Sequence, residues 1–222
     1  MDLVSLLQQS RLFSDMPRAV LEERLIPRGR TQEYQKDQFL ILPRQQVDKI
    51  GLVLSGRVHI LHLFENGGQS LMNAIPSGEF IAADLAFTHS RLAPYHAMAA
   101  APTRVFWLPA ELLSEHGPLD EKLRLTCLEG MLTLISQENM RKEYRLAILS
   151  RNGLRDRITA YLSMQAGRRN SASFAIPFSR EEMAAFLCVN RSALSHELSR
   201  MQKEGLITFR KNRFTLHIRD AE

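Results

Sequence analysis

Several features that define well-known protein classes are missing from this sequence. Only two of its 222 residues, Cys127 and Cys188, are cysteines, too few for a disulfide framework, a structural zinc site or a four-cysteine iron–sulfur cluster. No segment approaches the ~18 consecutive apolar residues of a membrane helix. The first residues lack a basic segment and a small-residue cleavage site. We therefore expect a cytoplasmic protein with reduced thiols, no secretory signal and no membrane partner.

Motifs of catalysis are missing as well. The sequence has no nucleophile elbow, no phosphate-binding glycine loop and no His/Cys cluster at metal-ligand spacing. The pair Gly67-Gly68 is better explained by a hairpin. We therefore predict a binding protein rather than an enzyme, with no catalytic residue, no metal site and no built-in cofactor.

The charge that is present is unevenly distributed. Residues 1–150 carry 16 Lys and Arg against 17 Asp and Glu, whereas residues 151–222 carry 13 against 7. A near-neutral body with a basic terminal third indicates a polyanion partner for that third. An ordinary solvated basic face is the alternative.

Short apolar runs separated by turn residues fill the first half of the chain. Two short helices, over residues 3–12 and from Pro17, precede them. Asn66-Gly67, between two such runs, is the sharpest hairpin signal. This spacing predicts an antiparallel sandwich or barrel. The runs are residues 39–42, 50–54, 58–63, 70–72, 95–98 and 104–108.

Residues 118–150 are predicted to form one long helix. Apolar residues recur at alternating steps of three and four, which is the pattern of a coiled-coil seam. Because the sequence contains no second helix of matching length, we expect the same helix of another copy as the partner. A buried helix in a single-chain bundle is the alternative. The expected dimer interface is Leu125, Leu128, Leu132, Ile135, Asn139 and Leu146.

A second apolar row lies beside this seam. It comprises Leu123, Cys127, Met131 and Leu134, and we expect it to cover the open face of the β-domain. A further helix is predicted from about Gly153 to Ala166, followed by a polar loop over residues 167–173.

The strongest functional signal lies near the C-terminus. Ser179 and Glu182 have the spacing of a capping box at the start of a short helix, and Cys188-Val189 follows as a tight turn. Asn190 can cap a second helix. Residues 206–218 then read as two strands around a tight turn. Together these elements predict a winged helix-turn-helix.

One face of the second helix carries candidate DNA-reading residues. The N-terminal half of a recognition helix reaches base edges in the major groove. We therefore predict base contacts from Arg191, Ser192, Ser195 and His196. Phosphate contacts are predicted for Arg180, Arg200, Lys211 and Arg213. A surface helix with ordinary solvated polar residues is the alternative.

Across nearly its whole length the chain resembles the Crp/Fnr family of bacterial transcription regulators. The resemblance is carried by residues 52–58, residues 78–81, the long helix, residues 149–158 and residues 179–207. It implies an α+β fold with an antiparallel, cupin-like β-roll sensor domain over residues 1–117, a dimerisation helix over 118–150 and a winged helix-turn-helix over 151–222. It also implies a homodimer on a two-fold-symmetric DNA operator, and contacts with RNA polymerase.

The sensor domain departs from the family pattern where cyclic nucleotides bind. Members that bind them carry a Gly-Glu pair and, further on, an Arg-Ser or Arg-Thr pair. Here Ala82-Ala83 and Tyr95-His96 stand in these places, and Arg91 is the only nearby replacement. Loss of the arginine removes a charge-assisted bond worth ~1.5–3 kcal/mol. We therefore predict a small effector other than cyclic AMP, or regulation without a ligand.

The identity of the effector stays open. Candidates to line a pocket between the β-roll and the long helix are Tyr95, His96, Ser136, Asn139 and Met140. Asn139 then has two possible roles, in the dimer register and in ligand contact. A haem sensor, with axial ligands among His59, His62, His89 and His96, is one alternative. A ligand-binding module that regulates another protein is the other.

The recognition helix departs from the family as well. The best-known members carry Glu and Arg where Ser192 and His196 stand. Glu is the usual acceptor toward cytosine, and His makes a weaker guanine contact than Arg. We therefore expect a target sequence that differs from the familiar half-sites.

Overall fold

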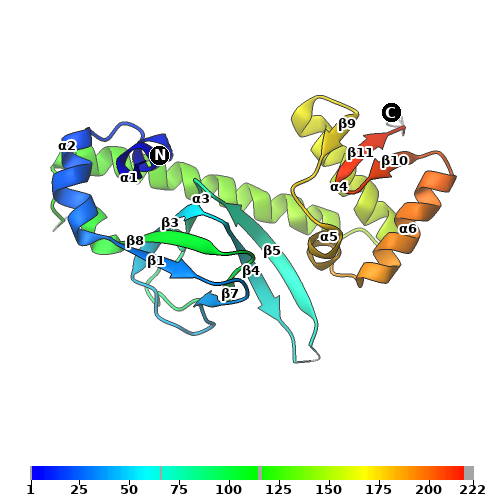
Figure 1. Ribbon diagram of the computed structural model, residues 1–222, viewed down its shortest axis with the longest axis horizontal. Helices are drawn as coiled ribbons and strands as arrows, with labels where there is room; N and C mark the ends of the chain where they lie inside the picture. The colour runs from blue at the N-terminus through cyan, green and yellow to red at the C-terminus, as the bar shows by residue number, and fades with distance from the viewer. Residues whose placement is uncertain (1, 66, 115–116, 218–222) are drawn as a thin grey trace. The chain divides into compact units, whose positions relative to one another are not determined.

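The computed structural model describes residues 2–65, 67–114 and 117–217 (Figure 1). Its internal contacts divide the chain into two compact units. The first contains the residues up to Leu63 together with Met72–Met140. The second contains Phe64–Leu71 and the residues from Arg141 onward.

The first unit consists of short helical segments, two four-stranded sheets and most of a long helix. Strand β5 and helix α3 continue into the second unit. In chain order the elements are α1 (Leu3–Gln9), α2 (Arg18–Val20), η1 (Leu21–Leu25), η2 (Ile26–Arg28), β1 (Arg30–Tyr34), β2 (Phe39–Ile41), β3 (Lys49–Ser55), β4 (Arg57–Leu63), β5 (Gln69–Pro76), β6 (Phe80–Ile81), β7 (His96–Ala99), β8 (Thr103–Pro109), η3 (Ala110–Leu113) and α3 (Glu121–Leu149).

The two sheets pack around an apolar core. Their strand orders are β1-β8-β3-β6 and β2-β7-β4-β5, and β3 pairs antiparallel with both β8 and β6. Val53, Ile60 and Trp107 belong to the buried cluster that both sheets supply. Trp107 Nε1 donates a hydrogen bond to the Tyr34 hydroxyl at 2.9 Å, so the indole N–H is satisfied inside the core. The predicted antiparallel β-domain is confirmed.

A second core joins the long helix to the outer face of the β1-β8-β3-β6 sheet. Cys127, Met131 and Leu134 of α3 are buried in one cluster with Leu7 of α1 and Ile50 of β3. The predicted second row of the long helix is thus confirmed as its core-facing side. The predicted helix itself is confirmed as α3, with slightly tighter bounds.

The second unit contains a winged helix-turn-helix, as predicted. Its three-stranded sheet has the order β10-β11-β9, and α5 and α6 pack beside it (Figure 1). The elements are α4 (Leu154–Arg169), β9 (Ser173–Ala175), α5 (Arg180–Phe186), α6 (Arg191–Lys203), β10 (Ile207–Arg210) and β11 (Arg213–Leu216).

Several local features differ from the sequence-based expectations, among them the short strand β6, which was not predicted. Strand β1 was not predicted, because four of its five residues are exposed and it shows no apolar alternation. Strand β9 was not predicted either. Residues 167–169, expected in a loop, extend α4, which ends where Asn170 adopts a left-handed conformation (φ 47°) and donates its N–H to Ala166 and Gly167 carbonyls.

Two expectations concern residues outside the described ranges. Asn66 of the predicted hairpin is one of them, and Ile218 at the end of the predicted second wing strand is the other. Gly67, the neighbour of Asn66, has a positive φ of 76°, as a tight hairpin turn requires.

Candidate nucleic-acid interface

Side-chain caps define both helices of the helix-turn-helix. Ser179 and Glu182 form the predicted capping box: the Glu182 N–H donates to Ser179 Oγ at 3.2 Å, and the Ser179 N–H donates to Glu182 Oε2 at 2.6 Å. Asn190 Oδ1 accepts the N–H of Ala193 at 2.7 Å. Because caps satisfy otherwise unpaired amides, the sequence fixes where α5 and α6 begin.

Helix α6 has a buried face and a polar face. Leu194, Leu198 and Met201 are completely buried. The structure brings the four predicted base-reading residues together on the N-terminal half of the helix. Arg191, Ser192 and His196 are exposed, and Ser195 is half-buried. Polar groups on the exposed start of a helix can reach base edges in a major groove.

Arg180 connects the start of α5 to the wing. Its guanidinium lies 4.9 Å from the centroid of Phe209 and 5.5 Å from that of Phe214. Its Nη2 donates to the Lys211 carbonyl oxygen at 3.0 Å. Burial, and then the charge of Arg191, lower the pKa of Arg180. The two guanidinium groups therefore repel each other, and a bound anion would relieve that repulsion.

Arg200 lies in a network of ion pairs behind the recognition face. Arg155 of α4 donates from Nε to Glu197 Oε1 at 2.6 Å. It also forms a bidentate ion pair with Glu204, with Nη1 to Oε2 at 2.6 Å and Nη2 to Oε1 at 2.9 Å. Arg200 lies 3.7 Å from Glu197 and 3.5 Å from Glu204. The phosphate contact predicted for Arg200 stays a prediction, because this guanidinium already faces two carboxylates.

Arg155 is a functional candidate that the sequence analysis did not single out. Its hydrogen bonds with Glu204 and Glu197 raise its own pKa, and the Arg155 contact lowers the pKa of Glu204. The pairs hold α6 to α4 across separations of 42 and 49 residues. No local pattern reveals such a contact, although the charges themselves are visible in the sequence.

The predicted dimer seam lies exposed on α3. Its apolar members are exposed, led by Leu132 at 67%, whereas Cys127 on the core-facing side is 0% exposed. Asn139 is exposed too. A stripe of large apolar side chains open to water indicates a surface that another molecule covers. The exposed apolar seam residues are Leu125, Leu128, Leu132, Ile135 and Leu146.

Ala82 and Tyr95 stand where the sequence departs from the cyclic-nucleotide pattern. The first has an unusual backbone conformation and the second contacts a carboxylate. Ala82 adopts a positive φ of 63°, a conformation that glycine adopts far more easily. The Tyr95 hydroxyl donates to Asp84 Oδ1 at 3.1 Å. Burial, and then Asp84, raise the pKa of Tyr95. This tyrosine therefore stays neutral and bonds an acidic group rather than a basic one.

The other residues predicted to line an effector pocket differ in their exposure to solvent. His96 lies on β7, and its Nδ1 is buried without a hydrogen-bond partner among the described residues. Ser136, Asn139 and Met140 are exposed on α3. On the same helix, Glu138 contacts strand β5: its Oε2 accepts a hydrogen bond from Asn73 Nδ2 at 3.0 Å. Arg91 is exposed in the loop before β7.

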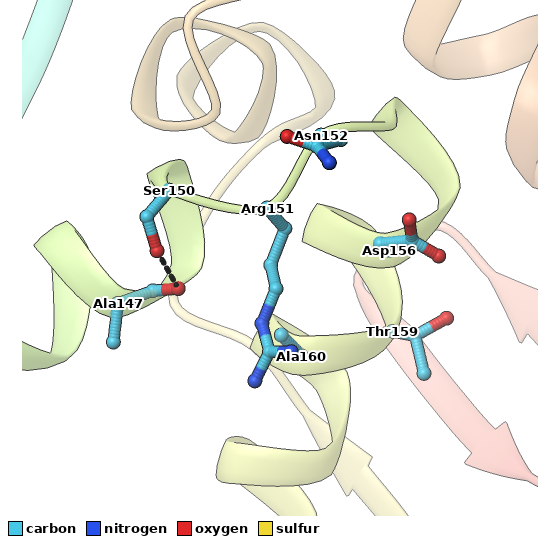
Figure 2. Close-up of a pocket in the computed structure, with 7 residues that line it drawn as sticks. All are labelled: Ala147, Ser150, Arg151, Asn152, Asp156, Thr159 and Ala160. Atoms are coloured by element: carbon cyan, nitrogen blue, oxygen red, sulfur yellow. Dashed lines mark hydrogen bonds between the residues drawn. The ribbon is translucent and has the colours of Figure 1, made fainter.

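An open polar groove of about 660 Å³ lies where α3 ends and α4 begins. Figure 2 shows the Arg151 side chain pointing toward Ala160, and the Ser150 hydroxyl bonded to the Ala147 carbonyl oxygen at 3.0 Å. Asn152, Asp156 and Thr159 complete the lining.

The described residues form neither a metal-binding cluster nor a membrane-spanning helix. Within the described residues, no group of three or more His, Cys, Asp or Glu is arranged to hold a metal ion. None of the described helices has both the length and the apolar character that a membrane span requires.

Two domain families match this chain. Residues 31–115 match the cyclic nucleotide-binding domain, and residues 156–222 match the Crp-like helix-turn-helix domain. Together the matches cover more than half of the chain, in the order found in Crp/Fnr regulators. The chain belongs to the Crp/Fnr family of transcription regulators.

Two curated relatives are distant from this chain in sequence. The Electron transport regulator A of Shewanella oneidensis is 23% identical over 183 residues, which is 80% of this chain and 71% of the relative. The Anaerobic regulatory protein of Pasteurella multocida is 21% identical over 194 residues, which is 85% of this chain and 68% of the relative.

Solved structures of Crp/Fnr-type regulators share the fold. The c-di-GMP responsive global regulator CLP of Xanthomonas campestris superposes with a TM-score of 0.67 at 16% identity, covering 87% of this chain and 96% of that one. A CooA mutant from Carboxydothermus hydrogenoformans gives 0.67 at 18% identity and 90% coverage of both chains. FixK2 of Bradyrhizobium japonicum gives 0.65 at 18%, covering 86% and 93%.

Proposed function

We propose that this protein is a cytoplasmic, homodimeric regulator that binds a two-fold-symmetric DNA operator through α6. The observation that carries the proposal is the capped α6, which buries Leu194, Leu198 and Met201 and turns its basic N-terminal half to solvent. Arg191 can donate two bonds to guanine, and His196 can donate to or accept from base edges. Regulation would act through RNA polymerase, as in other Crp/Fnr members.

Cations around α6 suit the phosphate backbone. The charge of Arg191, after burial, lowers the pKa of Arg180, and a phosphate between the two guanidinium groups would offset their repulsion. Lys211 and Arg213 lie in the turn and second strand of the wing. Contacts of this kind set register on the duplex and make affinity depend steeply on salt.

The exposed seam of α3 supports the homodimer. Leucine and isoleucine at heptad spacing bury well against the same residues of a parallel partner. A second copy also supplies the second recognition helix that a symmetric operator requires. Asn139 within the seam would favour a two-stranded register at some cost in stability.

The sensor region supports an effector other than cyclic AMP. A cyclic phosphate entering beside β7 would meet the Asp84 carboxylate and its Tyr95 partner, 3.1 Å apart. Like charges in a partly buried site repel strongly. The effector, where one acts, would therefore be a small molecule without an anionic group at this point.

DNA binding is tested with a duplex that the wild-type protein selects from a random pool. Fluorescence anisotropy should show a dissociation constant that rises steeply with salt. Arg191→Ala should weaken binding by ~1–3 kcal/mol, whereas Lys203→Ala, at the other end of α6, should change it little. Salt-independent binding, or equal effects of the two variants, would contradict the proposal.

Thermal unfolding with and without cyclic AMP tests whether the protein binds this nucleotide. A ligand that binds the folded state raises the melting temperature. We expect no shift at millimolar cyclic AMP. A clear upward shift would show that the site accepts the cyclic phosphate despite Asp84.

A further inference from the structure

Arg145 on α3 is the one residue with a charged side chain among the buried residues that the structure describes. Only 8% of it is exposed, and burial lowers its pKa. A guanidinium removed from water requires hydrogen-bond acceptors and packing that compensate for lost solvation. The surroundings of Arg145 therefore indicate what the side chain holds in place.

The surroundings of Arg145 are the turn of the helix-turn-helix. Its Nη2 donates to the Phe186 carbonyl oxygen at 3.3 Å and contacts Cys188 Sγ at 3.6 Å. The guanidinium carbon lies 5.3 Å from the centroid of the Phe186 ring. Phe186 is the last residue of α5, and Cys188 is in the turn that leads to α6. One side chain thus contacts both sides of the bend.

A third contact joins the same point to strand β5. Arg145 Nη2 donates to Ser70 Oγ at 2.7 Å, and Ser70 Oγ lies 3.3 Å from Cys188 Sγ. Ser70 is itself buried. The cluster of Arg145, Ser70, Phe186 and Cys188, the turn cluster, therefore unites three separate stretches of the second unit.

The turn itself needs external support. Cys188 adopts a positive φ of 56°, which is strained for any residue except glycine and persists only where the surroundings enforce it. Arg191, the first residue of α6, follows three positions later. Any relaxation of this turn would change the direction of α6 and of its base-reading residues.

We propose that Arg145 is a positioning residue for DNA recognition, which fixes the angle between α5 and α6 by holding the strained turn. This inference rests on the proposed function of α6 and deepens it. Arg145 and the exposed leucine seam belong to the same helix α3, so the contact joins the proposed dimerisation helix to the turn that leads into the recognition helix.

The test compares Arg145→Met and Arg145→Lys on two duplexes: one selected by the wild-type protein and one with the same bases scrambled. Arg145→Met should weaken binding to the selected duplex ten-fold or more and change binding to the scrambled duplex less than two-fold. Arg145→Lys should recover part of the loss, because an ammonium can still donate to Phe186 but lacks the planar stack.

Arg151→Met is the matched control. Arg151 is exposed, so this variant loses the same charge without touching the turn cluster, and it should affect both duplexes alike. If Arg145→Met weakens binding to both duplexes to the same extent, Arg145 acts only through its charge, and the proposal is overturned. Unchanged affinity for the selected duplex would equally overturn the proposal.

Amide hydrogen exchange tests the role of the turn cluster without DNA. Its result therefore does not depend on the proposed function. Ser70→Ala and Cys188→Ala each remove one polar atom of the turn cluster and preserve the backbone. Amide hydrogen exchange over residues 186–190 should then be faster, while α4 is unchanged. Unaltered exchange would overturn the proposal. A wild-type protein that selects no duplex would instead contradict the proposed function.

Discussion

Two buried tyrosines differ in whether their hydroxyl groups have hydrogen-bond partners. Tyr34 accepts from Trp107 Nε1 at 2.9 Å. Tyr161 is 1% exposed, and its hydroxyl has no partner among the described residues. A buried polar group without a partner lowers stability by roughly 1–3 kcal/mol. The two hydroxyl groups should therefore affect the free energy of unfolding in opposite directions.

Tyr161→Phe should raise the free energy of unfolding by about 1 kcal/mol, because it removes a desolvated hydroxyl and keeps the ring. The ring contacts with Phe178 and Phe186 stay available. Urea denaturation measures the change. Tyr34→Phe is the control and should lower stability by about 1 kcal/mol, since it leaves the indole N–H unpaired. A larger loss for Tyr161→Phe than for Tyr34→Phe would contradict the assignment.

Ala82 has a backbone conformation whose cost to stability a substitution can measure. Its positive φ of 63° is the conformation that glycine adopts without strain. Ala82→Gly should therefore raise the free energy of unfolding by about 1 kcal/mol. Ala83→Gly, at a position without positive φ, should lower it by about 0.5–1 kcal/mol. Denaturant midpoints that move in the same direction for both variants would refute this reading.

Among the elements, helix α3 has one face buried in the core and one face exposed to solvent. Leu132→Asp should convert the dimer into monomers, because an aspartate cannot be buried in an apolar seam. Leu132 is 67% exposed in the single chain, so the monomer fold should be unharmed. Thr133→Asp, exposed one position further on, should leave the dimer intact. Sedimentation velocity distinguishes these outcomes, and a dimeric Leu132→Asp protein would overturn the seam assignment.

The elements that could be predicted from sequence are those with a local signal. The capping box at Ser179, the cap at Asn190 and the long helix α3 each depend on a pattern within a short stretch of sequence, and the structure contains all three. Strand β1 could not be predicted, because its side chains face water and its partner β8 lies far along the chain. Its existence depends on pairing rather than on pattern.

The site divides in the same way. The polar face of α6 followed from helical spacing once its start was known. The contacts of Arg145 and Arg155 could not be foreseen, since they join residues separated by 41 to 75 positions. Likewise, only the structure shows that Arg200 faces Glu197 and Glu204. Charge and residue type were visible in the sequence, but their partners were not.

In the whole molecule, the uneven distribution of charge along the sequence corresponds to the division of the chain into two units. The excess of Lys and Arg over Asp and Glu lies in residues 151–222, which form most of the second unit. The first unit is nearly neutral and carries the exposed seam residues of α3 from Leu125 to Ile135, whereas Leu146 belongs to the second unit. This division suits a protein that associates through one part and meets a polyanion with the other.

In the proposed complex, two chains joined along α3 present two α6 helices to one duplex. Its most direct test is the mass of the complex with the selected duplex, by sedimentation or native mass spectrometry at low ionic strength. We expect two protein chains per duplex, and no comparable complex for Leu132→Asp. A complex of one chain per duplex with full affinity, or no complex at all, would contradict it.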